Sequence, residues 1–112
     1  MKSSIIGPLM SELGLLHVSD DKHLMVDSDL NVNTVARLKD EGIALIDTLQ
    51  SPVVVDLAGA RVQGSAAVAL LIAWQRHCVQ RHRDLLFINA SSHLLEIAKV
   101  CDVEDILAFT DA

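Results

Sequence analysis

The sequence predicts a single α/β domain in which strands alternate with helices. Its 112 residues are within the usual length of one domain, and 51% of them are hydrophobic, enough for a core without disulfides or a structural metal. Aromatic residues make up only 3% of the chain, so the core must consist of leucine, isoleucine, valine and alanine. Short β-branched runs alternate with longer segments of helical period, in the order strand, strand, helix, strand, helix, strand, helix and a short C-terminal element. This alternation indicates a layered α/β arrangement.

A β-hairpin is expected near the beginning of the chain. Residues 1–12 read as a lead-in, and residues 13–112 as the domain. Two short apolar pieces, Leu13–Val18 and His23–Val26, flank the polar turn residues Ser19–Lys22.

The first helix is expected to run from Val35 to about Gln50. Its apolar residues recur at helical spacing on one stripe, and most of its charged residues fall off that stripe. Pro52 disfavours a helical residue before it, so the helix should end near Gln50. Three candidate capping residues precede the helix: Asp29, Asn31 and Asn33.

A central strand is expected at Val53–Leu57. Its neighbouring positions are all apolar, which predicts coverage on both faces, as in a parallel sheet. Asp56 lies near the end of this strand, where its carboxylate is expected to bond to loop N–H groups, and Ala58–Ala60 follow as a loop. The next strand is expected within Asp84–Ala90.

The second helix begins at Ser65 and should continue to about Arg81. It consists of strong helix formers and is apolar nearly all round its first turns, whereas a helix lying on a sheet needs only one apolar stripe. Either the helix is buried between two flanking helices, or part of its surface is exposed and covered by a partner. Small residues at its start would let another backbone approach closely: Ala66, Ala67 and Ala69.

The third helix should be capped by Ser91 or Ser92. Leu94, Leu95, Ile97, Ala98 and Cys101 are available for its buried face, and Ile106–Phe109 forms the last apolar element.

Ser65 has two interpretations. As a helix cap, its hydroxyl would bond to an otherwise unpaired backbone N–H. As a switch, the same hydroxyl lies at the positive end of a helix, where a phosphate is tolerated electrostatically and would add bulk and charge to any interface built there.

Charge and cysteine usage exclude several classes of function. The net charge of −6 argues against binding to nucleic acid, and the basic residues between Arg76 and Arg83 read as a solvated helix end. Cys78 and Cys101 read as buried or half-buried thiols in a reducing compartment, and no cysteine or histidine spacing suggests zinc. No metal or other cofactor is therefore expected.

Motifs for catalysis and for membrane insertion are also missing from the sequence. Neither a Gly-rich phosphate loop nor a Gly-x-Ser-x-Gly elbow is present, so no catalytic residue is expected. The longest apolar run, Ala66–Trp74, is far shorter than the ~20 residues of a membrane span, and no secretory signal is evident. The expected location is the cytoplasm.

The segment Val54–Leu71 resembles the signature of STAS domains. That signature runs from a strand through Asp-Leu-Ser-Gly and Asp-Ser-Ser-Gly-Leu into a leucine-rich helix, and the later segment Leu94–Leu107 is also similar to members of the family. The resemblance implies a mixed four- to five-stranded sheet with about three to four helices and no enzymatic activity. Gly64 replaces the acidic residue of the signature, and Ala66 and Ala67 replace its second serine and its glycine.

Within the family, the run Ser65–Arg76 is similar to MlaB-like subunits of the Mla phospholipid ABC transporters of Gram-negative bacteria. The resemblance implies that the start of this helix contacts the ATPase subunit, MlaF, at the cytoplasmic face of the inner membrane, so that the transporter maintains outer-membrane lipid asymmetry. The expected partner-binding residues are Ser65, Ala66, Ala67, Val68 and Leu71.

The STAS resemblance also implies an alternative function. In anti-sigma-factor antagonists, a partner kinase phosphorylates the serine at the position of Ser65. A homodimer of the chain is a further alternative.

Overall fold

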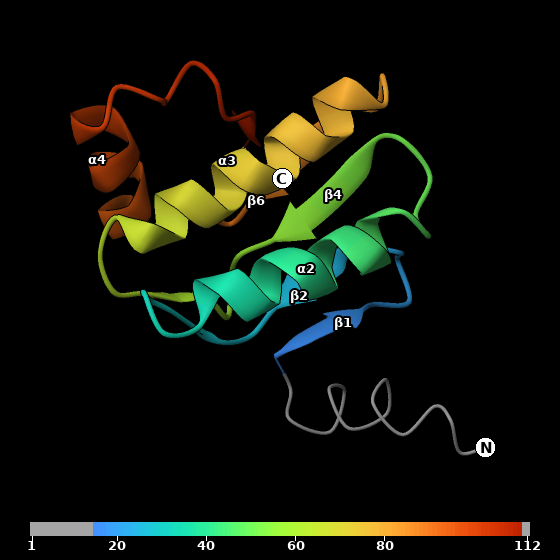
Figure 1. The fold of residues 1–112 in the computed structure, drawn as a ribbon, viewed down its shortest axis with the longest axis horizontal. Coiled ribbons are helices and arrows are strands. Elements are labelled where there is room, and N and C mark those ends of the chain that lie inside the picture. Colours follow the sequence, from blue (N-terminus) through green and yellow to red (C-terminus); the bar gives the residue numbers. More distant parts are fainter. Residues whose placement is uncertain (1–14, 111–112) are drawn as a thin grey trace.

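The computed structural model describes residues 15–110, which form one five-stranded mixed sheet with helices packed on it (Figure 1). The strand order is β1-β2-β4-β6-β7, in which β1 and β2 are antiparallel and the other neighbours are parallel. The strands of this sheet are β1 (Leu16–Val18), β2 (Leu24–Val26), β4 (Val53–Asp56), β6 (Leu85–Ile88) and β7 (Phe109–Thr110). The expected hairpin is confirmed from Leu16 onward, and the expected lead-in lies outside the described residues.

The helices of the described part are α2 (Val35–Ile46), α3 (Ala66–Gln80) and α4 (Ser92–Val100). Figure 1 shows α2 and α3 side by side over one face of the sheet, with α4 beside the start of α3. The mixed α/β fold and its order of elements are therefore as the sequence predicts. Between residues 15 and 110, no helix has both the length and the apolar character that crossing a membrane requires.

Two strands were not expected from the sequence. β3 (Asp29–Leu30) and β5 (Arg61–Val62) pair in parallel as a separate two-stranded sheet. Asp29 lies where a helix cap was expected, and a strand of two residues is too short to show a strand period in the sequence. We call this pair the β3–β5 arm.

The central strand β4 is covered fully on one face only. Val53 and Val55 are buried, and they belong to the core beneath α2 and α3. Val54 and Asp56, which point to the opposite face, are half-buried. The expectation of coverage on both faces is therefore wrong, because only the face beneath α2 and α3 is fully covered.

Helix α2 ends at Ile46, four residues before the expected end. The N–H groups of Thr48 and Leu49 bond to carbonyls three residues back, at 3.0 Å each, so the helix tightens and stops there. Leu49 is still buried, which explains why the apolar pattern extended past the helix.

Tryptophan 74 of α3 packs into α2 at a glycine. A Cβ added at Gly42 would overlap the Trp74 indole, so glycine is what allows the ring to fit. The indole Nε1–H donates to the Lys39 carbonyl at 3.2 Å, and Trp74 is fully buried. This contact sets the position of α3 on α2.

The ends of α2 and α3 are joined by charged side chains. His77 Nε2 lies 2.7 Å from Asp47 Oδ1, and this hydrogen bond lowers the pKa of the Asp47 carboxyl. Arg83 donates to the carbonyls of Ile46 and Leu49 at the C-terminus of α2. The basic end of α3 is therefore only partly solvated, as predicted for Arg76, Arg81 and His82, which are exposed. His77 and Arg83 instead bind the C-terminal end of α2.

The two cysteines differ in their surroundings. Cys78 is buried, and this burial raises the pKa of its thiol. Cys101 is exposed at the C-terminal end of α4, so the expectation that it contributes to the buried face is wrong.

Candidate docking site at the start of α3

The first residues of α2, α3 and α4 lie at the same edge of the main sheet. Each helix follows a strand segment of parallel orientation, and such helices begin at the carboxyl ends of the strands. Asn31, just before α2, donates through its side chain to Gln63 Oε1, just before α3, at 2.6 Å. The two helix starts are therefore neighbours, and Val32 beside them is 79% exposed.

Ser65 occupies the N-cap position of α3 and is exposed. Its side chain makes no capping hydrogen bond, although its carbonyl accepts from the N–H groups of Val68 (3.0 Å) and Ala69 (3.3 Å). The expected hydroxyl cap is therefore absent, because the backbone of Ser65 is already helical (φ −70°, ψ −12°), whereas a capping residue usually lies in the β region. The hydroxyl is left available to another molecule.

Gly64 precedes Ser65 with a φ of +111°, a conformation that favours glycine. No atom lies within 4 Å of a Cβ added there, so the requirement for glycine comes from the backbone and not from crowding. The glycine that replaces the acidic residue of the STAS signature thus makes the turn into α3.

The predicted partner-binding residues divide into two groups. Ser65 is exposed and Ala66 is half-buried, so both can face a partner. Ala67, Val68 and Leu71 are at most 3% exposed and belong to the core of the chain itself. A partner cannot reach these three side chains in this fold, and we correct their placement accordingly.

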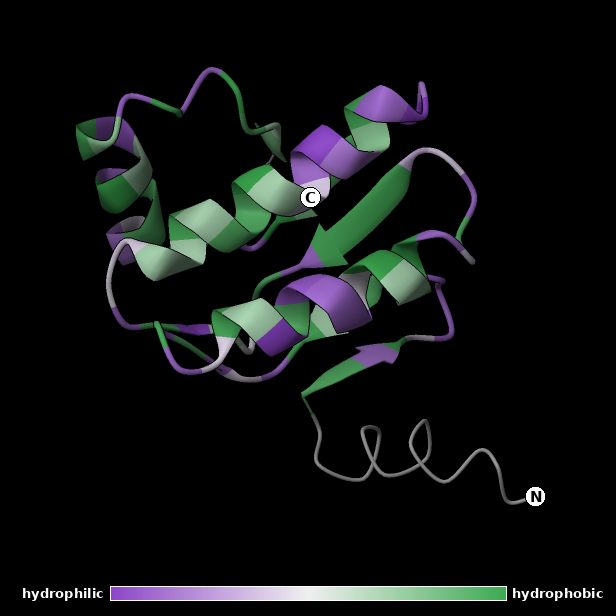
Figure 2. Ribbon diagram, in the orientation of Figure 1, coloured by the Kyte–Doolittle hydropathy of each residue, from purple (hydrophilic) through white to green (hydrophobic). Residues whose placement is uncertain are grey.

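The outward face of α3 carries other residues. Ala69 and Arg76 are exposed, and Ile72 and Ala73 between them are half-buried. They recur every three or four residues, as one helical face requires. Figure 2 shows that this face is hydrophobic along the first turns of α3 and hydrophilic toward its end. We call Ser65, Ala66, Ala69, Ile72 and Ala73 the α3 surface.

A signal for this face was present in the sequence. Arg76 is the first charged residue of the helix, and a charged side chain without a buried partner must point to solvent. Counting back from Arg76 in steps of three or four leads to Ala73, Ile72 and Ala69. The sequence alone does not show which side of the helix is exposed, since its buried and exposed positions carry similar apolar residues.

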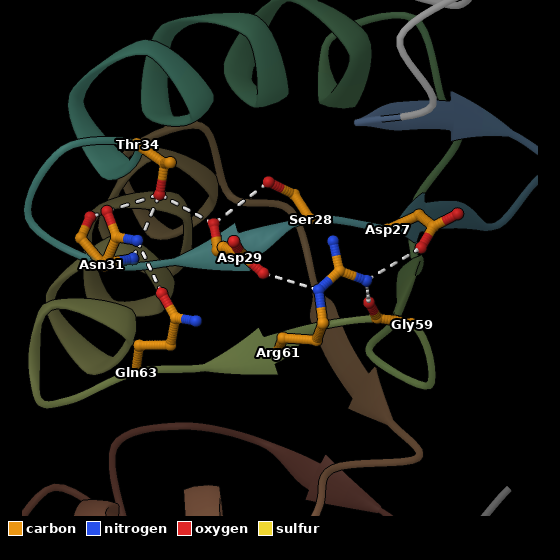
Figure 3. A network of polar contacts seen from close by, with 8 residues as sticks. All are labelled: Asp27, Ser28, Asp29, Asn31, Thr34, Gly59, Arg61 and Gln63. Carbon is orange, nitrogen blue, oxygen red and sulfur yellow. Dashed lines mark hydrogen bonds and ion pairs between the residues drawn. The ribbon is translucent and has the colours of Figure 1, made fainter.

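The loop before α3 is held by the polar contacts in Figure 3. Arg61 Nε lies 2.5 Å from Asp29 Oδ1, and Arg61 Nη1 lies 3.6 Å from Asp27 Oδ1. The hydrogen bond to Asp29 raises the pKa of the Arg61 guanidinium. On the other side of the network, Thr34 Oγ1 donates to the Asp29 carbonyl at 2.7 Å and accepts from the Asn31 N–H at 3.0 Å.

Asp56 has a structural part in the same region. Its Oδ1 accepts from the Ala58 N–H at 2.9 Å and from Asn89 Nδ2 at 3.0 Å, so it joins the ends of β4 and β6. None of the three expected caps begins α2, because the N-cap position is occupied by Thr34. Asn31 acts one turn earlier: its Oδ1 accepts from the Asn33 N–H at 2.8 Å. For α4, Ser91 is the capping residue, and its Oγ accepts from the Leu94 N–H at 3.1 Å.

In the part of the chain that the structure describes, no group of three or more histidine, cysteine, aspartate or glutamate residues is placed so that it could hold a metal ion. A hollow of about 620 Å³ lies between the β1–β2 turn and the α2–β4 loop, lined by Val18, His23, Leu49 and Pro52 among others. These segments are at the amino end of β4, opposite to the edge where Ser65 lies. None of the residues that line this hollow belongs to the α3 surface.

The chain belongs to the STAS domain family, whose model matches residues 14–108. The description of that model is "Mlab, STAS domain", which agrees with both the family and the subgroup that the sequence resembles. None of the curated proteins matches the chain.

Solved structures agree with this fold. A chain of the Acinetobacter MlaFEDB complex in its ATP-bound Vtrans2 conformation is 24% identical, with a TM-score of 0.72, over 85% of this chain and 98% of that chain. A Thermotoga maritima protein assigned as an anti-sigma factor antagonist is 9% identical (TM-score 0.68), and SpoIIAA in its unphosphorylated form is 12% identical (TM-score 0.65). Both alignments cover 87% of this chain and 85% of the other.

Proposed function

We propose that this chain is a non-catalytic STAS subunit that docks on the cytoplasmic ATPase of a Gram-negative phospholipid ABC transporter, the kind that maintains outer-membrane lipid asymmetry. The observation that carries the proposal is the α3 surface, whose apolar residues are exposed at Ala69 and half-buried at Ala66, Ile72 and Ala73. It begins at an exposed serine whose hydroxyl makes no capping hydrogen bond. The likeness to a chain of the MlaFEDB complex supports the choice of partner. The subunit would then sit at the inner-membrane face through the ATPase.

The α3 surface has the chemistry of a close-packing contact. Alanines at 66, 69 and 73 let a second backbone approach, and Ile72 supplies an aliphatic side chain for an apolar groove. Removing such surface from water stabilises a complex by about 25 cal/mol per Å². The association cost offsets part of this gain, so a useful affinity also requires that the surface be held rigid before binding.

The test is binding between the purified chain and the ATPase subunit of the transporter. Ala69→Arg places a long cation on the α3 surface and should weaken binding by at least about ten-fold, a change of about 1.4 kcal/mol. Ala44→Arg is the matched control, because Ala44 is also an exposed helical alanine but lies on α2. Circular dichroism should show that both variants are folded. Equal affinities for Ala69→Arg and the unmodified chain would refute docking through α3.

The second candidate function is an anti-sigma-factor antagonist, in which phosphorylation of Ser65 would control binding. It is favoured by the exposed Ser65 hydroxyl and by the likeness to SpoIIAA and the Thermotoga protein. Mass spectrometry of the chain isolated from its own cells separates the two candidates. A phosphate on Ser65 together with no binding to the ATPase would favour the antagonist.

The same preparations test self-association. A homodimer through the α3 surface would compete with the ATPase, since both use Ala69 and Ile72. Light scattering after size exclusion should then give a dimer for the unmodified chain and a monomer for Ala69→Arg.

A further inference from the structure

The segment that carries Ser65 is fastened to the rest of the domain by few backbone contacts. It leaves the main sheet after β4, and its strand β5 pairs with the two-residue strand β3 before α3 begins. The backbone hydrogen bonds of this parallel pair hold it there. At the two ends of the pair, the Arg61 N–H donates to the Ser28 carbonyl at 2.9 Å, and the Gln63 N–H donates to the Leu30 carbonyl at 3.0 Å. Side chains add further contacts to this short pair.

Arg61 joins both sides of the β3–β5 arm. It binds the carboxylates of Asp27 and Asp29 on one side, and its Nη1 donates to the Gly59 carbonyl of its own loop at 3.4 Å (Figure 3). The guanidinium is a planar fork of donors, so one side chain can serve acceptors in several directions at once. Its side chain is 59% exposed, which makes it a surface contact and not part of the core.

The anchored residues alternate along the segment up to Ser65. Gly59 lies close to the residues that precede β3: an added Cβ would meet Asp27 Oδ1 at 2.9 Å and the Val26 carbonyl at 3.0 Å. Arg61 follows two residues later, and Gln63 two residues after that, with its side chain bonded to Asn31 at 2.6 Å. Ser65 is the next position in this series.

We propose that Arg61 is a positioning residue for docking: its contacts with Asp27, Asp29 and Gly59 hold the β3–β5 arm closed, and thereby fix the place of Ser65 at the start of the α3 surface. This inference rests on the proposed function for its effect on binding. It does not rest on it for its effect on the arm. A preorganised surface binds more tightly, because less conformational freedom is lost on association.

A charge swap tests the proposal. Asp29 and Arg61 are register partners in the parallel β3–β5 pair, so exchanging them places the same two charges across the same position. Arg61→Asp and Asp29→Arg each put like charges opposite one another and should open the arm. The double variant restores the ion pair with position 29 but leaves a carboxylate at position 61 beside Asp27, so it should close the arm in part. Arg61→Lys keeps the charge without the fork and should give an intermediate result.

Two measurements are made on each variant. Hydrogen exchange reports the Gln63 amide, which is protected only while the arm is closed, and calorimetry reports affinity for the ATPase subunit. Each single variant should speed exchange at Gln63 and weaken binding by about ten-fold. Exchange in the core strand β4 should stay unchanged. The double variant should recover part of the slow exchange and part of the affinity, because the contact with Asp27 is not restored.

The outcomes are distinct. Slow exchange at Gln63 in both single variants would overturn the positioning role. Recovery of slow exchange without recovery of affinity would mean that Arg61 touches the partner directly, which also overturns it. If even the unmodified chain fails to bind the ATPase, the proposed function is wrong, and exchange at Gln63 alone still decides whether Arg61 holds the arm.

Discussion

The two halves of α3 are held in opposite ways. The rear half is tied to α2 by directional contacts: Trp74 donates to a backbone carbonyl, and His77 pairs with Asp47. The front half has a buried face that is purely apolar and an outward face of alanine and isoleucine. The hydrogen bond of Trp74 and the ion pair of His77 fix the position of the helix. The outward side chains of the front half therefore need not hold the helix in place and can contact a partner. The predictions below test this division, from the largest expected effect to the smallest.

Neighbouring positions in the front half should respond very differently to the same substitution. Val68→Asp buries an unpaired carboxylate in the core and should cost at least about 3 kcal/mol of unfolding free energy. Ala69→Asp changes an exposed site and should cost less than about 0.5 kcal/mol. Urea denaturation followed by circular dichroism measures both. Similar stabilities for the two variants would contradict the orientation of α3.

The two serines that begin α3 and α4 provide a smaller contrast. Ser91→Ala removes the hydroxyl that accepts from the Leu94 N–H and should cost about 1 kcal/mol. Ser65→Ala removes a hydroxyl without a capping bond, so the unfolding free energy should stay nearly the same. Any loss of ATPase affinity in Ser65→Ala would then come from the interface itself. A loss of stability equal to that of Ser91→Ala would mean that Ser65 caps the helix after all.

The smallest effect is expected at the contact between His77 of α3 and Asp47 at the end of α2. Because the hydrogen bond from His77 lowers the pKa of Asp47 in the folded chain, Asp47 stabilises the fold above its unfolded pKa, near 3.8. This contribution is lost as the pH falls through the lower folded value. Asp47 is 45% exposed, so Asp47→Asn should cost less than about 1 kcal/mol at pH 6.

Denaturation at several pH values checks that the contribution of Asp47 to the unfolding free energy falls on acidification. The difference between Asp47→Asn and the unmodified chain should shrink below about pH 4. Asp40→Asn, an exposed change on the same helix, is the control. A difference that grows on acidification would rule out the pairing of Asp47 with His77.

The order of strands and helices was predictable because most elements are long enough to show their own period. The start of α2 at Val35 and the cap at Ser91 follow from local residues. The division of α3 into buried and exposed faces did not follow, because alanine and valine suit either environment. The β3–β5 arm was also missed, since the Arg61–Asp29 contact joins residues 32 positions apart and leaves no local pattern.

The glycine at position 42 has a consequence for how the helices can move. The Trp74 ring fits α2 only there, because one turn away in either direction the helix carries Leu38, Lys39, Leu45 and Ile46. A slide of α3 by one turn, about 5.4 Å, would drive the indole into a side chain. The indole therefore fixes the axial position of α3 relative to α2. If a bound protein displaces one helix along its axis, the other helix must move with it.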